Sequence, residues 1–208
     1  MFRPALLLLL CLSLPGCAAL SALEGEPDRN VFELRGPDVG IGQCGGARIS
    51  ELVIELPKTR GTLDSERIMI RPSALQTQYL PDAVWGDPVP AMLQRLLVET
   101  LGSYDAFGHV GRAPLGVAGD LAMISEIGDF NAETSGDGAL IRLSVDAQLV
   151  REMDASIVAR GRFAATTEAA STRTNDLIPA FDAAAQELVA EMTGWTLSKV
   201  GVNTANCR

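Results

Sequence analysis

The clearest alternation of apolar and polar positions in the chain runs from residue 141 to residue 149, where every second side chain is apolar. A period of two is typical of a β-strand with one buried face. Strands are also predicted at residues 121–130 and 156–166, with turns near Gly136 and Asp154. Because short turns join antiparallel neighbours, these three segments predict an antiparallel meander.

Shorter strands are predicted in the first half of the chain. Residues 31–34 alternate and read as an edge strand, and residues 48–56 alternate over a longer stretch. A further strand is expected at residues 66–71, followed by residues 76–80. Residues 107–112 read as a short strand before the meander.

Two segments place apolar residues at the three- and four-residue steps of an amphipathic helix. The first follows Asp87, which can cap a helix, and stops near Gly102. The second is capped by Thr174 or Asn175 and runs to Trp195. We expect its apolar stripe to pack on the sheet, with a groove for a partner as the alternative. The stripe consists of Ile178, Phe181, Ala185, Leu188, Met192 and Trp195.

The order of these elements is β-β-β-α-β-β-β-β-α. It predicts one α+β domain, with a mostly antiparallel sheet packed by two helices.

The N-terminus has the features of a secretory signal. Arg3 precedes an apolar run at residues 5–14, which is too short to span a bilayer as a helix. The run ends in Leu-Pro-Gly-Cys17, which resembles a bacterial lipobox, although proline is unusual before its glycine. We therefore expect residues 1–16 to be a signal peptide and Cys17 to be lipidated.

This interpretation divides the chain into three parts. A lipidated tether is expected at residues 17–30 and the folded domain at residues 31–208. The alternative is an ordinary signal peptide cleaved nearby, after Ala19 or Ala22.

The formal net charge is −9 in the full chain and becomes −10 when Arg3 leaves with the signal peptide. An acidic chain without a basic cluster is a poor ligand for nucleic acid or for anionic lipid headgroups. Attachment to a membrane would therefore depend on the lipid, and two or more acyl chains give a stable anchor.

Two cysteines remain after Cys11 is removed and Cys17 is lipidated. Cys44 and Cys207 would lie in an oxidising compartment, which favours a disulfide between them. Closing so long a loop would stabilise the fold by up to about 5 kcal/mol in the chain-entropy description. Two unpaired thiols are the alternative.

The residues that usually carry catalysis are sparse. Residues 40–45 match G-x-G-x-x-G, but a predicted strand follows the motif where a dinucleotide site needs a helix, which favours a loop. His109 is the single histidine and has no patterned partner. Glu126 and Asp129 are three apart in a strand and are expected on opposite faces. We therefore predict no catalytic residue, cofactor or metal, and no enzyme.

Several blocks together resemble the ABC-type transport auxiliary lipoproteins. After the lipobox, residues 31–34 resemble the opening strand of that family. Residues 67–71 (RIMIR), 78–80 (QYL) with Trp85 and the leucine-rich segment 93–101 resemble its most recognisable block. The second half is matched by residues 119–130 and 149–151 and by the alanine-rich C-terminal helix.

The resemblance implies a lipoprotein of an ABC system that contains an MCE-type (mammalian cell entry) protein and moves lipids between the inner and outer membranes. The chain would dock the MCE-type protein at the membrane, facing the periplasm. Ala18 is not the aspartate that retains many lipoproteins at the inner membrane, which favours the outer membrane. A homo-oligomer is compatible with these features.

Tyr79 and Trp85 are the candidate partner residues, because large aromatic side chains are enriched at interfaces. The alternative for Trp85 is a place in the core. Two other functions stay open, a periplasmic lipid-binding carrier and a purely structural envelope lipoprotein.

Overall fold

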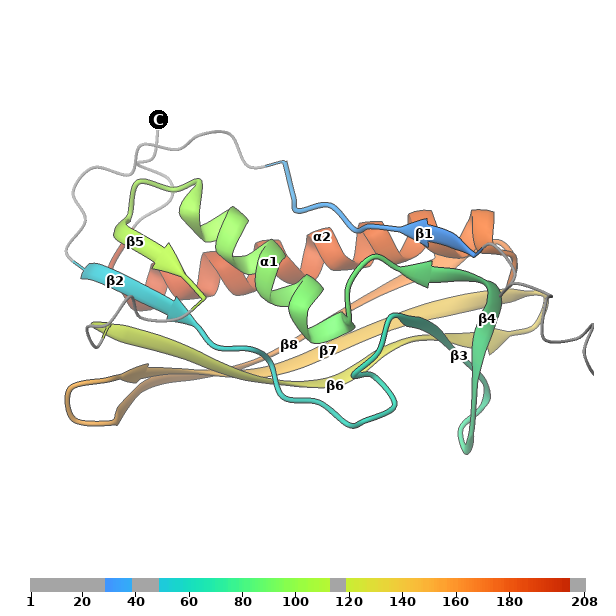
Figure 1. The fold of residues 1–208 in the computed structure, drawn as a ribbon, viewed down its shortest axis with the longest axis horizontal. Coiled ribbons are helices and arrows are strands. Elements are labelled where there is room, and N and C mark those ends of the chain that lie inside the picture. The colour runs from blue at the N-terminus through green and yellow to red at the C-terminus, as the bar shows by residue number, and fades with distance from the viewer. Residues whose placement is uncertain (1–28, 39–48, 113–118, 203–208) are drawn as a thin grey trace, which may run out of the picture.

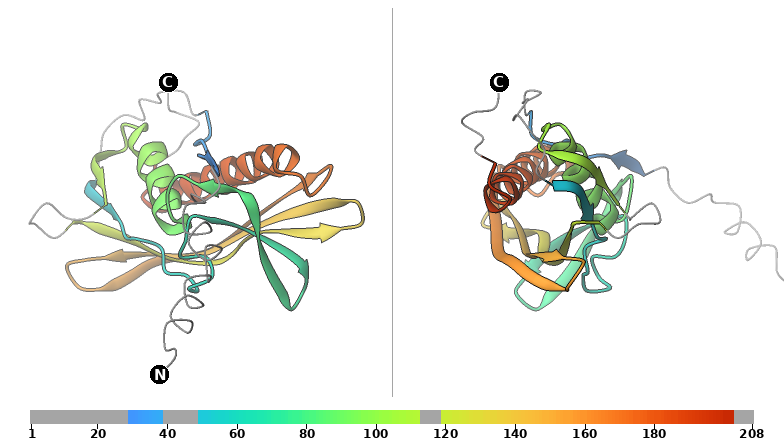
Figure 2. Two further views of the ribbon diagram at one scale, coloured as in Figure 1. Left: turned by 45° about the vertical axis from the view of Figure 1, so that its right-hand side comes forward. Right: turned by 90° about the vertical axis from the view of Figure 1, so that its left-hand side faces the viewer.

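The computed structural model describes residues 29–38, 49–112 and 119–202. Within these ranges, eight strands form one sheet and two helices lie on the same face of it (Figures 1 and 2). The elements are β1 (Asn30–Phe32), β2 (Ile49–Ile54), β3 (Arg67–Ser73), β4 (Gln76–Trp85), α1 (Val89–Gly102), β5 (Phe107–Gly111), β6 (Leu121–Ser135), β7 (Gly138–Arg151), β8 (Ser156–Ala169) and α2 (Thr174–Lys199).

The predicted antiparallel meander is confirmed. β6 pairs with β7 from Leu121 to Ser135, and β7 pairs with β8 along almost its whole length. Gly136 has a positive φ of 60° in the first turn, and Ala155 has a φ of 55° in the second. The inward-facing residues of β7 are buried, as the alternation predicts.

The prediction of a mostly antiparallel sheet is wrong, because the sheet is mixed. Its order is β1-β4-β3-β6-β2-β5, with β7 and β8 continuing from β6. Four pairs are parallel, namely β1–β4, β2–β5, β2–β6 and β3–β6, and three are antiparallel among the described strands. Four strands, rather than three, precede α1.

The parallel pairs join strands that are distant in the sequence. The chain leaves β2, passes through β3, β4 and α1, and returns in β5 to lie parallel beside β2. Parallel neighbours require such crossovers, whereas hairpins always give antiparallel neighbours. A pattern of alternation identifies a strand but does not identify its partner. The alternation therefore could not predict the parallel pairs of this sheet.

Both helices contribute to one hydrophobic core. The predicted packing of the α2 stripe is confirmed, since Phe181, Leu188 and Met192 are fully buried and α2 lies against β7 and β8. Asp87 does not cap α1, whose N-cap position is Pro88 and has no side-chain hydrogen bond. In the described part of the chain, no helix has an apolar stretch long enough to cross a bilayer.

Candidate functional site

A charged site lies on the sheet face opposite the helices, where β3 meets β6. The two strands are paired at only two positions, Ile70 with Ala132 and Arg71 with Glu133. Beyond Glu133, β3 turns into its hairpin with β4 while β6 continues toward β7. The strands therefore diverge at their carboxyl ends and leave a space between them.

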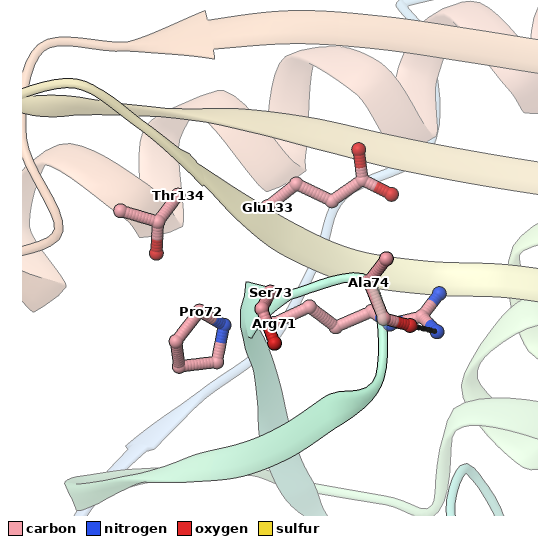
Figure 3. A pocket seen from close by; sticks show the side chains of 6 residues that line it. All are labelled: Arg71, Pro72, Ser73, Ala74, Glu133 and Thr134. Atoms are coloured by element: carbon pink, nitrogen blue, oxygen red, sulfur yellow. Dashed lines mark hydrogen bonds between the residues drawn. The ribbon is translucent and has the colours of Figure 1, made fainter.

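This space is a pocket of about 180 Å³. Figure 3 shows its lining, which consists of Arg71, Pro72, Ser73, Ala74, Glu133 and Thr134. Arg71 Nη2 donates a hydrogen bond of 3.0 Å to the Ala74 carbonyl oxygen and so holds the hairpin turn beside the pocket. The volume of the pocket is below the roughly 300–1,000 Å³ of most small-molecule sites, so the pocket suits a single side chain.

Glu133 is held by a bidentate pair with Arg142 of the neighbouring strand. Arg142 Nε and Nη2 each donate a hydrogen bond of 3.1 Å to the Glu133 carboxylate. These hydrogen bonds are the largest cause that lowers the pKa of Glu133, and the charge of Arg71 adds to the effect. The same pair raises the pKa of Arg142. Glu133 is therefore a stable carboxylate rather than a proton donor near neutral pH.

A second carboxylate, Asp129, lies between two arginines. Arg60 and Arg71 each place a guanidinium nitrogen 3.8 Å from Asp129 Oδ1, and Ser144 Oγ donates to Asp129 Oδ2 at 2.9 Å. Arg60 also donates to the Gly128 carbonyl oxygen. This small polar network therefore joins three parts of the chain. They are the loop that carries Arg60, the β3–β4 hairpin that carries Arg71, and the β6–β7 pair that carries Asp129 and Ser144.

The arrangement of Asp129 was not predicted from the sequence. A β-bulge shifts the register between Ile127 and Asp129. As a result, Glu126 pairs with Asp146 and Asp129 pairs with Ser144, so both carboxylates lie on one face of the sheet. The expectation that they face opposite ways is wrong. Gly128, inside the predicted strand, was the signal for a bulge.

One donor of this site is left without an acceptor. The Nε of Arg71 is buried and has no hydrogen-bond partner among the described residues. A buried donor of this kind is costly unless an oxygen acceptor meets it. No group of His, Cys, Asp and Glu side chains in the described ranges could hold a metal ion. His109 is exposed on β5, at the far edge of the sheet from β3.

The two aromatic residues singled out from the sequence lie in different environments. Tyr79 is half-buried, donates from its hydroxyl to the Thr62 carbonyl oxygen at 3.1 Å, and has the Arg67 guanidinium 3.8 Å from its ring centroid. Trp85 is 1% exposed and packs edge-on against Phe130 and Phe181. This burial favours the core interpretation of Trp85, whereas Tyr79 stays accessible to a partner.

The segment that follows β1 is hydrogen-bonded to helix α2 through Arg35. The backbone N–H and Nε of Arg35 donate to the Asp182 carboxylate of α2 at 2.9 and 3.1 Å, and Gln186 donates to it at 2.9 Å. Leu34 is buried in the core beside this pair. The chain that leads from the N-terminus is therefore joined firmly to the domain. Cys17, Cys44 and Cys207 lie outside the described residues.

Comparisons with known proteins agree with this architecture. A protein of Xanthomonas campestris, XCC0632, has the same fold with a TM-score of 0.70 and 22% identity, covering 82% of this chain and 96% of that one. A second solved structure, of an uncharacterized protein, gives a TM-score of 0.62 at 13% identity, covering 81% of this chain and 99% of the other. At these identities the likeness shows the fold alone.

A curated relative, the uncharacterized protein bll6063 of Bradyrhizobium diazoefficiens, is 24% identical over 178 residues. The match covers 85% of this chain but 47% of that protein, so the chain spans about half the length of this relative.

The family model of the ABC-type transport auxiliary lipoprotein component matches residues 42–193. This match defines the class of protein, an auxiliary lipoprotein component of ABC-type transport. The chain belongs to the ABC-type transport auxiliary lipoprotein family.

Proposed function

We propose that this chain is an adaptor that docks an MCE-type protein of an ABC system moving lipids between the inner and outer membranes. The observation that carries the proposal is the family match, which extends over both halves of the described domain. The polar site between β3 and β6 supports the proposal. Its carboxylates, Glu133 and Asp129, are paired with arginines, and such charged side chains beside a small pocket suit protein binding. Tyr79, accessible near the same hairpin, is a candidate contact.

The proposed anchor is an acylated Cys17, which also forms the mature N-terminus. An anchor confines the domain to a thin layer beside the membrane and raises the effective concentration of a weak docking surface. Ala18 favours the outer membrane as its location. Mass spectrometry of the N-terminal peptide tests the anchor, and an unmodified Cys17 in membrane fractions would exclude it.

The proposed Cys44–Cys207 disulfide would join the loop before β2 to the C-terminal tail. Intact mass after alkylation, with and without reductant, tests this pairing in periplasmic material. Two freely alkylated thiols would rule it out.

Genetics tests the proposed function against its alternatives. The genes for this chain and for the MCE-type protein of the same bacterium are deleted singly and together. An adaptor predicts the same change in outer-membrane lipid composition in all three strains, with no addition in the double deletion. A structural lipoprotein would leave lipid composition unchanged, and a carrier would release bound lipid when the purified domain is extracted.

A further inference from the structure

The last strand of the sheet leaves a long backbone edge open. Strand β8 pairs only with β7, so its other edge meets no other strand of the described ranges. Its 14 residues include neither proline nor lysine, two residues that keep many exposed edges from pairing with other chains. The pairing with β7 is regular from Ala159 to Ala169. This stretch is therefore a template for one more strand.

The turn between β6 and β7 determines which backbone groups point to the open edge. Two residues connect these strands, and in such a hairpin the flanking residues, Ser135 and Gly138, form a hydrogen-bonded pair. Because the direction alternates along a strand, the odd-numbered residues of β7 bond to β8, and they face odd-numbered residues of β8. The even-numbered residues of β8 therefore direct their N–H and C=O groups to the open edge. They are Arg160, Arg162, Ala164, Thr166 and Glu168, and all five are exposed.

Two charges on this edge have no partner in the part of the chain that the structure describes. The exposed side chains of Arg160 and Glu168 make no hydrogen bond or ion pair there. Arg162, by contrast, donates from its Nε to Asp146 of β7 at 2.8 Å. A strand that matches both free charges must present a carboxylate opposite Arg160 and a cation opposite Glu168. A second copy of β8 that runs antiparallel presents both in this order.

One antiparallel register satisfies all four charges of two copies. With Ala164 on a two-fold axis, Arg160 of each copy lies opposite Glu168 of the other. Arg162 then lies opposite the neutral Thr166, so its pair with β7 is kept. Every one of these positions directs its backbone groups to the open edge, so the register consists of hydrogen-bonded pairs.

Neighbouring registers match the charges less well. An axis at Arg162 would place two guanidinium groups opposite each other, and like charges at this distance are destabilising. An axis at Ala165 would place Glu168 opposite Arg162. That arginine is already bound to Asp146, and Arg160 would be left unpaired. The distribution of charge therefore favours the axis at Ala164.

We propose that β8 binds β8 of a second copy of this chain, antiparallel and about a two-fold axis at Ala164. The two sheets become one continuous sheet, joined by roughly ten backbone hydrogen bonds, two for each hydrogen-bonded pair. Each copy offers the other the same surface, as in other two-fold contacts. This inference goes beyond the proposed function and does not depend on it. Strand β7 lies between β8 and the site where β3 meets β6, so that site stays open in the pair.

Exchange of charges tests the register in the full-length, detergent-solubilised lipoprotein. R160E places two carboxylates opposite each other at both ends of the paired strands, and E168R places two guanidinium groups there. Each single variant should raise the Kd of the dimer by about tenfold or more, because two pairs change at once. The double variant R160E/E168R restores both pairs and should return the Kd to the wild-type value. Analytical ultracentrifugation measures these constants. E187R, at an exposed position of α2, changes the charge as E168R does and should leave the Kd unchanged.

Ala164→Pro tests the backbone contacts. The proline removes an N–H that points to the open edge, so it costs no hydrogen bond to β7 and is tolerated on an edge strand. The Kd of its dimer should also rise by about tenfold or more. Thermal unfolding of every variant checks that the monomer is folded.

Ala164→Cys reports the contact in cells. On the axis, the two introduced residues have Cα atoms about 5.5 Å apart, which is within reach of a disulfide. A non-reducing gel should show a dimer that is linked through this position. Ala183→Cys, at an exposed alanine of α2, is the matched control and should give no dimer.

Each outcome decides the inference. Dissociation by both single reversals, with recovery in the double variant, supports it. A wild type that is monomeric at every concentration overturns it, and so does a dimer that the single reversals leave unchanged. A double variant as weak as the single ones, or an Ala164→Cys protein linked to a different protein, also overturns it. None of these results bears on the adaptor function, because binding of the MCE-type protein is measured separately.

Discussion

Trp85 and Tyr79 lie six residues apart on β4 but have opposite environments. The indole packs inside an aromatic cluster with Phe130 and Phe181, whose rings are themselves stacked with centroids 5.8 Å apart. The phenol ring of Tyr79 lies against the Arg67 guanidinium, and its hydroxyl donates to the Thr62 carbonyl oxygen. Aromatic composition alone did not separate these roles, because interfaces and cores are both rich in large aromatic residues.

Trp85→Ala is expected to lower the free energy of unfolding by about 3–5 kcal/mol, since it empties a large volume in the core. Tyr79→Ala should cost only about 1 kcal/mol, the contribution of one hydrogen bond and one accessible cation–π contact. Urea denaturation of the two variants and the wild type measures both. A loss below about 1 kcal/mol for Trp85→Ala would contradict the buried position of the indole.

Glu133→Gln should make stability respond less to acid. The folded pKa of Glu133 is lowered from its ordinary value of 4.5, chiefly by the Arg142 hydrogen bonds. The pair therefore stabilises the fold fully above the unfolded pKa, and that contribution disappears as the pH falls through the folded pKa. The variant should be less stable by up to about 1 kcal/mol at pH 7, as for other partly exposed pairs.

Thermal unfolding from pH 7 down to pH 3 measures this difference, with exposed Glu168→Gln as the matched control. The gap between Glu133→Gln and the wild type should narrow in acid. A gap that is constant over the whole range would mean that the ion pair does not contribute.

At the scale of elements, the sequence predicted strands and helices better than it predicted their partners. The meander and both helices form where periodicity places them, because alternation and three- to four-residue spacing report local burial. The parallel neighbours of β2 depend on a crossover through α1, and no local signal encodes that path. The bulge at Gly128 likewise adds one residue to β6 and so places Asp129 on the same face of the sheet as Glu126.

The contact between Arg35 and Asp182 should control how firmly the N-terminal segment is held on α2. Asp182→Ala removes the acceptor of the Arg35 backbone N–H and of its side chain. We expect faster hydrogen exchange at the amide of Arg35 and its neighbours, with the amides in the middle of α2 still protected.

Glu187→Ala, an exposed position on the same helix, is the control and should leave exchange unchanged. If Asp182→Ala also leaves the Arg35 amide protected, the segment is held by Leu34 and β1 alone.

At the scale of the whole molecule, the two ends of the sheet carry different elements. One end holds β1, the start of α2 and the β6–β7 turn, and the β7–β8 turn lies at the other end (Figures 1 and 2). The sequence predicted the family, because blocks from both halves of the chain occur in the right order. It did not predict which apolar side chains stay exposed, since the exposure of Ile157 or Met153 follows from packing rather than from hydropathy.

Co-purification of the full-length chain with the MCE-type protein of the same bacterium tests the central claim most directly. The two proteins are expressed together, membranes are solubilised in mild detergent, and this chain is captured through a C-terminal tag. The account predicts that the MCE-type protein is retained in a fixed ratio through a second purification step. Its complete loss, with a Cys17-acylated and folded lipoprotein in hand, would contradict the adaptor function.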